Sequence, residues 1–221
     1  MDPAAESGNR TAPSTASRLV WVAFAAVLGL VAYAGIASVA RRPSAESGPP
    51  VLGEVPAFRL SNRNGQSISR DDLRGKVWIA DFIFTRCAGV CPVLSAEMSR
   101  LELKLDVARA GDLRLVSFSV DPVHDTPEIL DEYAGRLRAG DGWLFLTGPR
   151  DDLHVLIKDG FRLNVAEREE AGGDPNELIT HSDRFVLVDG AGRIRGYYHG
   201  TDADSVARLV ADVAVLRSEA S

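Results

Sequence analysis

The two cysteines of the chain, Cys87 and Cys91, are separated by three residues, and Pro92 follows the second. Two thiols at this spacing could form a disulfide, run a thiol–disulfide redox cycle or bind a soft metal ion. If this turn is helical, both sulfurs point the same way and the Cα atoms lie about 6 Å apart, inside the disulfide range. The spacing alone therefore permits a metal site and a disulfide.

The cysteines are predicted to lie where a buried strand joins a helix. Residues 76–84 form a nearly continuous apolar run, which is typical of a central strand buried on both faces. After Cys91, apolar residues recur at helical spacing, at Leu94, Met98, Leu101, Leu105 and Ala108. Because a helix N-terminus stabilises negative charge, we expect it to lower the thiol pKa values and make thiolates available near neutral pH.

The rest of the chain after residue 50 alternates predicted strands and helices. A hairpin is expected at 57–69, with its turn at Asn64-Gly65, and a second hairpin around the turn 189–192. Further strands are expected at 113–120 and 143–148, and after residue 160 a strand and a polar loop. Helices are expected after Thr126 up to Gly140, at 149–160 and at 202–217. Asp125 or Thr126 would cap the first of these helices.

This order of elements predicts an α/β domain with a mixed sheet and helices on both faces. It matches the thioredoxin-like fold with an N-terminal β-hairpin extension. In that fold the loop that enters the strand after residue 182 faces the cysteine turn. His181 lies in this loop, so we expect it to complete a metal site with Cys87 and Cys91, because imidazole is a common partner of thiolates. Two other histidines, His154 and His199, are expected at the surface.

The first 50 residues are expected to lie outside the folded domain. Residues 1–17 have the composition of a disordered tail. Residues 19–40 are uncharged, and their length fits a single transmembrane helix. The alternative is a cleavable signal peptide with a cleavage site at 38–40, but its apolar region would usually be about 7–15 residues long. Residues 41–50 form a linker to a soluble domain at 51–218. The flanking arginines do not decide the orientation of the anchor.

The composition excludes two classes of protein. The net charge is −6 and the basic residues are dispersed, so we expect no nucleic-acid partner. Two cysteines are too few for a disulfide scaffold, and their close spacing favours a site over a structural crosslink.

Three segments of the chain resemble the SCO/SenC family of copper chaperones for cytochrome c oxidase assembly. They are DFIFTRCAGVCPVLSAEMSRL at 81–101, SFSVDPVHDTPEIL at 117–130 and ITHSDRFVLVDGAGRIRGYY at 179–198. The resemblance covers residues 51–218, and the anchor before it is also similar to family members. Cys-x-x-x-Cys-Pro alone is moderately specific. Together with Asp-Pro-x-x-Asp-Thr-Pro and a histidine 90 residues beyond Cys91, it is strong.

The resemblance implies that Cys87, Cys91 and His181 bind one copper ion, as Cu(I) or Cu(II). The protein would be an assembly factor and not an enzyme. It would load the binuclear copper centre of cytochrome c oxidase subunit II, reduce the cysteine pair of that subunit, or do both. The domain would lie outside the cytoplasmic membrane. A thiol reductant of that compartment must then keep the cysteines reduced, and other copper carriers are expected partners.

Residues near the ligands could support them. Asp121 and Asp125 are expected to organise the turn and the helix cap, and either could contact the ligand loop. His124 lies between them, at a position where family members often have a charged residue. It is a candidate for an auxiliary ligand, although a solvated turn residue is the simpler interpretation.

Three other functions compete with copper delivery. A thiol–disulfide oxidoreductase acting on exported proteins is one, but such proteins usually have two residues between the cysteines and do not need His181. A thiol peroxidase of the peroxiredoxin type is the second. Peroxiredoxins, however, have Thr three residues before the reactive cysteine, and this chain has Phe84 before Cys87 and Ala88 before Cys91 at that position. The third is a purely structural role, in which Cys87 and Cys91 are an ordinary buried pair or an inert disulfide. Zinc also fits two cysteines and a histidine, and it ranks below copper only because of the resemblance.

Overall fold

The computed structural model describes Gly29 and residues 48–163 and 183–219. The chain divides into two compact units, residues 1–46 and 47–221, and all the strands and helices named below belong to the second. Among the described residues, no helix has both the length and the apolar character needed to cross a membrane. The predicted tail and the predicted anchor at 19–40 lie outside the described residues, apart from Gly29.

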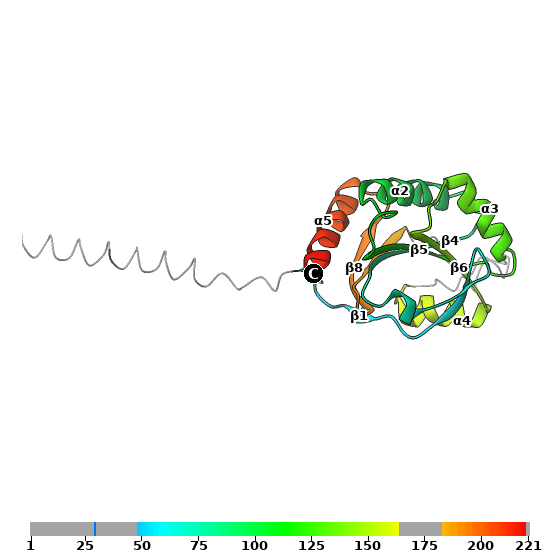
Figure 1. Ribbon diagram of the computed structural model, residues 1–221, viewed down its shortest axis with the longest axis horizontal. Helices are drawn as coiled ribbons and strands as arrows, with labels where there is room; N and C mark the ends of the chain where they lie inside the picture. Colours follow the sequence, from blue (N-terminus) through cyan, green and yellow to red (C-terminus); the bar gives the residue numbers. More distant parts are fainter. Residues whose placement is uncertain (1–28, 30–47, 164–182, 220–221) are drawn as a thin grey trace, which may run out of the picture. The chain divides into compact units, whose positions relative to one another are not determined.

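The second unit is built on an eight-stranded sheet (Figure 1) in the order β1-β8-β7-β4-β5-β6-β2-β3. The strands are β1 Gly53–Glu54, β2 Arg59–Asn62, β3 Ser67–Ser69, β4 Val77–Ile83, β5 Leu113–Ser119, β6 Trp143–Thr147, β7 Arg184–Val188 and β8 Arg193–His199. The three central strands β4, β5 and β6 are parallel, and all other pairs are antiparallel. This is the mixed α/β sheet that the order of elements predicts.

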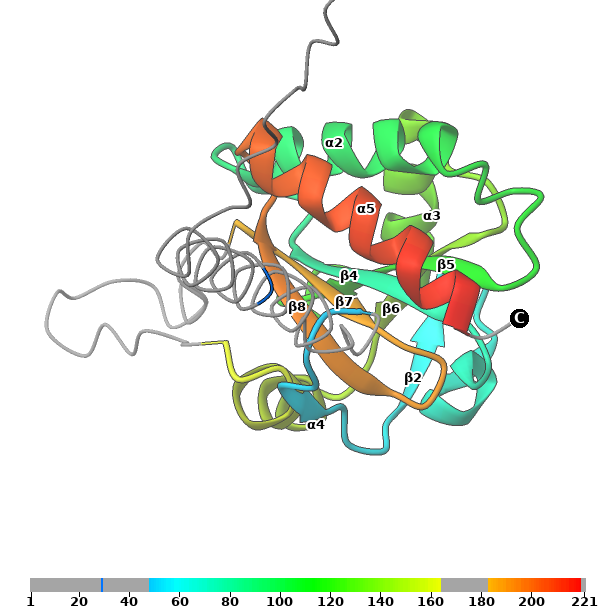
Figure 2. The same cartoon turned by 90° about the vertical axis from the view of Figure 1, so that its left-hand side faces the viewer.

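Helices cover both faces of the sheet (Figures 1 and 2). On one face lie α2 Cys91–Lys104, α3 Pro127–Leu137 and α5 Ala203–Glu219, with α5 beside α2. On the other face lie α4 Arg150–Val155 and the helical segments η1 Arg70–Leu73 and η2 Leu156–Gly160. Each face therefore has its own apolar core, because successive strand residues point to opposite sides of the sheet.

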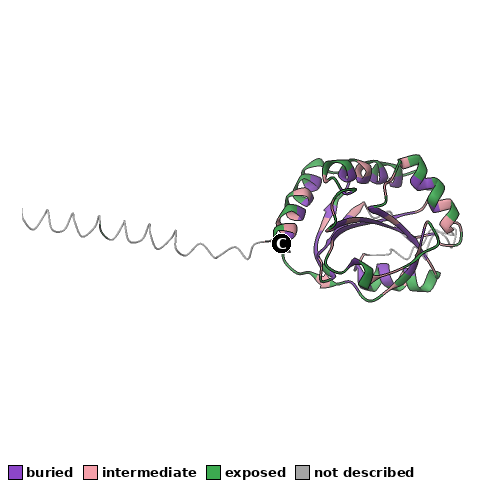
Figure 3. Cartoon of the chain, viewed as in Figure 1, coloured by how far each residue is buried: buried purple, intermediate pink, exposed green. Residues whose placement is uncertain are grey.

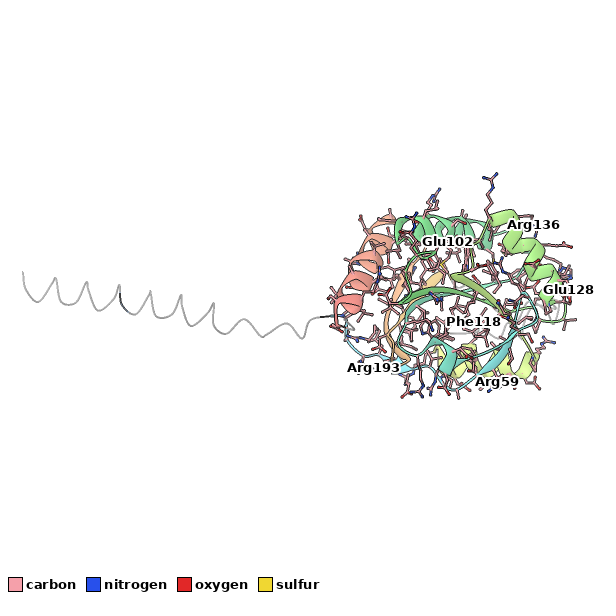
Figure 4. All side chains as sticks on the ribbon, in the orientation of Figure 1. Arg59, Glu102, Phe118, Glu128, Arg136 and Arg193 are labelled. Carbon is pink, nitrogen blue, oxygen red and sulfur yellow. The ribbon has the colours of Figure 1, made fainter. Side chains whose placement is uncertain are left out.

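Strand β4 lies between the two cores, and all seven of its residues are buried (Figure 3). Ile79 packs under α2, while Phe82 faces α4. Phe118 lies in the second core (Figure 4), with its ring stacked on Phe82 at 5.7 Å and inclined to Phe161 at 5.3 Å. This two-sided burial explains the unbroken apolar sequence of the strand.

Several predicted elements are confirmed. Strands β2 and β3 form the expected hairpin, and Gly65 has the positive φ of 77° that its turn needs. Thr126 caps α3, its hydroxyl accepting the Ile129 N–H at 3.5 Å. The second hairpin is formed by β7 and β8.

Two helices end earlier than predicted. Helix α2 stops at Lys104, so Leu105 and Ala108 lie beyond it, because Asp106 adopts a left-handed φ of 50°. Helix α3 stops at Leu137, where Arg138 is left-handed, rather than just before Gly140. Residues 161–163 are not in a strand, and the rest of the strand and loop predicted there lies outside the described residues.

The chain enters this unit at the end of the sheet opposite the cysteine turn. Strand β1 pairs with the beginning of β8, where Gly53 is opposite Ile194. Ile194 is level with the beginning of β4 in the sheet, because Val188 pairs with Ile194 on one side and with Trp78 on the other. The cysteine turn follows Ile83 at the other end of β4. The full length of β4, at about 3.3 Å per residue, therefore separates the entry of the chain from the cysteine turn.

Candidate metal centre

Both cysteines lie at the carboxyl end of β4, as predicted. Cys87 belongs to the turn between β4 and α2, and Cys91 is the first residue of α2. Both are free thiols, and only 9% of Cys87 and 4% of Cys91 is exposed. The Gly89 N–H donates to Cys87 Sγ at 3.4 Å. The two thiols are therefore recessed beneath the turn rather than presented at the surface.

The electrostatics of Cys91 differ from the prediction. Burial, and after it a hydrogen bond with Cys87, raise the pKa of the Cys91 thiol to about 12. The expected lowering by the helix N-terminus is outweighed, because a helix terminus typically contributes about 0.3–1 kcal/mol whereas burial can shift a pKa by several units. The hydrogen bond also shows that the two sulfur atoms are neighbours. Cys91 holds its proton until a metal ion displaces it or an oxidant converts the dithiol to a disulfide.

Asp125 holds the turn that precedes Cys87. It is fully buried, and its carboxylate accepts the Thr85 hydroxyl at 2.6 Å and the Ser119 hydroxyl at 2.7 Å. The Thr85 N–H lies 3.3 Å from both carboxylate oxygens. This carboxylate therefore ties the turn to the end of β5 and to the start of α3.

Asp121 makes a second link between the same two loops. Its carboxylate accepts from the Arg86 guanidinium at 2.6 Å, and its backbone N–H donates to the Ser119 hydroxyl. His124 lies in this loop, and its N–H donates to the Asp121 carbonyl. No hydrogen bond or ion pair joins the imidazole of His124 to the described residues of the cysteine turn. The structure thus brings Asp121 and Asp125 to the turn, but not the His124 ring.

A buried polar chain beneath α2 was not predicted. Trp143 Nε1 donates to Ser117 Oγ at 2.9 Å, and Ser117 donates to Asp81 Oδ1 at 2.5 Å. The other carboxylate oxygen, Asp81 Oδ2, is buried and has no hydrogen-bond partner in the described part of the chain. Burial raises the pKa of Asp81 to about 7. The sequence signal was available, because Asp81 is the only charged residue in the apolar run of β4.

Asp81 is close enough to the thiols to influence them. Its charge contributes to the raised pKa of Cys91 and, after burial, to that of Tyr133. Tyr133 comes from α3, and its hydroxyl is 2.8 Å from the Ser95 hydroxyl, one helical turn after Cys91. The underside of the dithiol is therefore polar, whereas the rest of this core is apolar.

The histidines are placed differently from one another. His181 lies outside the described residues. His199 is exposed as predicted, with Nδ1 2.9 Å from the Asp183 carboxylate at the start of β7. His154 is half-buried rather than fully at the surface, and its Nε2 is buried without a hydrogen-bond partner among the described residues. Within residues 48–163 and 183–219, no three His, Cys, Asp or Glu side chains are grouped to hold a metal ion.

The fold and the site define a class of protein: a thioredoxin-like α/β domain with a recessed pair of free thiols where a central strand meets a helix. The SCO1/SenC family model matches residues 49–216, which is most of this unit. The chain belongs to the SCO1/SenC family.

Individual relatives agree with this assignment. The SCO1 protein homolog of Bacillus subtilis is 34% identical over 166 residues, which is 74% of this chain and 83% of that protein. The structure of BsSco, named as a member of the Sco family of cytochrome c oxidase assembly proteins with a disulfide switch, has a TM-score of 0.65 at 32% identity. It covers 77% of this chain and 97% of its own. Yeast Sco1 with copper bound has a TM-score of 0.58 at 25% identity. The match covers 75% of this chain and 90% of the yeast chain.

Proposed function

We propose that this protein binds one copper ion through Cys87, Cys91 and His181 and delivers it to the binuclear copper centre of cytochrome c oxidase subunit II. The observation that carries the proposal is the pair of neighbouring free thiols, recessed at the carboxyl end of β4. Membership of the SCO1/SenC family and the copper-bound yeast relative support the choice of metal.

The donor set fits copper. Thiolate sulfurs are soft donors that prefer Cu(I), and an imidazole can complete a three-coordinate site. Since metal binding deprotonates the thiols, the high pKa of Cys91 makes the apparent affinity depend on the proton concentration. Asp125 and Asp121 hold the ligand turn through Thr85 and Arg86, which limits the reorganisation needed when copper binds.

The same proposal includes an anchor and a compartment. Residues 19–40 would be a single transmembrane helix in the cytoplasmic membrane, with the thiol domain on the extracytoplasmic side. The described chain enters the domain at the end of the sheet opposite the cysteine turn, which supports a tether attached away from the dithiol. Membrane fractionation of the full chain and of a chain without residues 1–42 tests it, and equal release of both into the soluble fraction would refute the anchor.

Thiol reduction is the alternative function. The neighbouring sulfurs of Cys87 and Cys91 could cycle between dithiol and disulfide, and the BsSco relative is named for a disulfide switch. On this alternative the protein would reduce cysteines of exported proteins, and copper binding would be incidental.

A competition titration separates the two functions. The reduced full chain in detergent is titrated with Cu(I) against a chromophoric chelator. We expect one tight equivalent, with an affinity at least tenfold lower in Cys87→Ser, Cys91→Ser and His181→Ala. His199→Ala is the matched control, because it removes an exposed imidazole that pairs with Asp183 and is not a proposed ligand, and it should bind as the wild type does. Unchanged binding in His181→Ala together with efficient reduction of protein disulfides would favour the reductase.

A further inference from the structure

We propose that the copper acceptor docks on an apolar rim around the cysteine turn, with Val93 and Val123 as its main contacts. The rim comprises the exposed residues Ala88, Gly89, Pro92, Val93 and Val123. This inference rests on the proposed copper delivery and adds the surface and the chemistry of the partner.

Because the two thiols are buried, an acceptor that takes copper from them must contact the rim. Cys87 and Cys91 are 9% and 4% exposed, so an acceptor sulfur can reach them only when the acceptor lies against the residues around them. Direct transfer needs both proteins to hold the same copper ion for a moment. The surface that covers the dithiol at that moment is the surface of the acceptor.

Two segments far apart in the sequence form the rim. Val93 lies in the first turn of α2 and is 54% exposed, while Val123 lies in the loop between β5 and α3 and is 73% exposed. The ion pair of Arg86 with Asp121 joins these segments, since it links the cysteine turn to the loop of Val123. Single exposed apolar residues are common on protein surfaces, but these two flank one buried reactive site.

The charge around the dithiol also indicates the kind of partner. Between Cys87 and Leu94, the only ionisable side chains are the two thiols. Arg86 precedes them, and the Asp121 carboxylate at 2.6 Å balances its charge. An acceptor that matches this rim has apolar side chains around its own copper-binding cysteines. Docking then depends on burial of apolar surface and only weakly on salt.

The transfer that this docking permits is a ligand exchange. Cu(I) held by the thiolates of Cys87 and Cys91 forms bonds to two acceptor cysteine sulfurs as its bonds to this protein break. The two protons of the acceptor thiols move to Cys87 and Cys91, and copper stays Cu(I), so no oxidant or reductant is needed.

The test is a copper-transfer assay with charged variants of the rim. The full chain carrying Val93→Glu and Val123→Glu is loaded with Cu(I) and mixed with the soluble domain of oxidase subunit II, copper-free and reduced. We expect the transfer rate at low acceptor concentration to fall at least tenfold, with Cu(I) affinity within twofold of the wild type. The rate should recover at saturating acceptor, because the defect is in docking.

Two controls isolate the rim. Leu103→Glu changes a residue of the same helix that is 82% exposed but more than three turns from Cys91, and Val155→Glu changes one on α4 that is 57% exposed. Both should transfer copper at the wild-type rate. The milder Val93→Ser and Val123→Ser pair, which removes apolar surface without adding charge, should slow transfer by a smaller factor.

The outcomes distinguish this inference from the proposed function. If the wild type transfers copper and the rim variants match it, or if the controls are equally slow, the rim is not the docking surface. If the wild-type chain neither binds nor transfers copper, the proposed function fails and the inference, which rests on it, fails with it. Slow transfer by the rim variants alone, with copper affinity retained, supports the inference.

Discussion

The carboxylate of Asp125 and the hydroxyl of Thr85 lie 2.6 Å apart, although 40 residues separate them in the sequence. Thr85 is two residues before Cys87, and Asp125 also accepts from Ser119 at the end of β5. The conformation of the cysteine turn is therefore set by the neighbouring loop as well as by its own sequence. A buried carboxylate with several donors is a strong constraint, because each donor would lose its partner if the carboxylate were removed.

Replacement of Asp125 by Ala should loosen the turn. We expect the free energy of unfolding to fall by about 2–4 kcal/mol, because buried donors of Thr85 and Ser119 lose their acceptor. If the turn holds copper as proposed, the Cu(I) affinity should fall about 10–100-fold. Urea denaturation and chelator competition measure the two effects.

The matched control is Asp131→Ala, which removes an exposed carboxylate on α3. It should change stability by less than about 0.5 kcal/mol. An Asp125→Ala protein as stable as this control would contradict the role assigned to the carboxylate.

The buried carboxyl of Asp81 should make stability depend on pH. Its pKa is about 7 in the folded protein, above the ordinary value of 3.8, because burial disfavours the charged form. Between these two values the folded state holds a proton that the unfolded state has released. Stability therefore falls as the pH rises from about 4 to about 7, and Asp81 contributes nothing further above that range.

Denaturation of the reduced, metal-free protein at pH 5 and pH 8 measures this dependence. We expect the free energy of unfolding of the wild type to be about 2–3 kcal/mol lower at pH 8 than at pH 5. The decrease should be much smaller in Asp81→Asn. Tyr133 and Cys91, which face the same carboxyl, have raised pKa values and keep their protons in this range. Asp141→Asn, an exposed carboxylate, should keep the wild-type slope. Equal slopes in wild type and Asp81→Asn would show that Asp81 is ionised at pH 5.

The sequence was sufficient for the fold because its signals are strong where burial is complete. The apolar run of β4, the helical spacing of Leu94, Met98 and Leu101, and the Asn64-Gly65 turn each point to one local structure. The ends of α2 and α3 were predicted wrongly because single left-handed residues, Asp106 and Arg138, stop them. Neither residue is of a type that demands this conformation, so the tertiary context decides.

The site was less predictable than the fold. The spacing of Cys87 and Cys91 and their position after β4 were sufficient to place the dithiol. The burial of the two thiols could not be predicted in this way, and it reverses the expected direction of the Cys91 pKa shift. Whether a helix N-terminus or burial dominates depends on which side chains pack above a thiol. The groups that interact electrostatically with Cys91, such as Asp81 and Tyr133, belong to other elements.

Gly200 is a close-packed position beside the first turn of α2. A Cβ at this residue would lie 2.5 Å from Leu94 Cδ2 and 2.8 Å from the Phe185 ring. Leu94 and Phe185 are both fully buried, and Leu94 follows Cys91 by three residues. We therefore expect Gly200→Ala to lower the free energy of unfolding by about 1–3 kcal/mol through overpacking.

Gly135→Ala gives the opposite expectation from the same chemical change. Gly135 lies within α3, where a new Cβ meets no atom within 4 Å. Alanine has the higher helix propensity, so this variant should be more stable by about 0.5–1 kcal/mol. Urea denaturation of the two variants side by side should give shifts of opposite sign. Stabilisation by Gly200→Ala would mean that β8 and α2 are less tightly packed at this point than the structure shows.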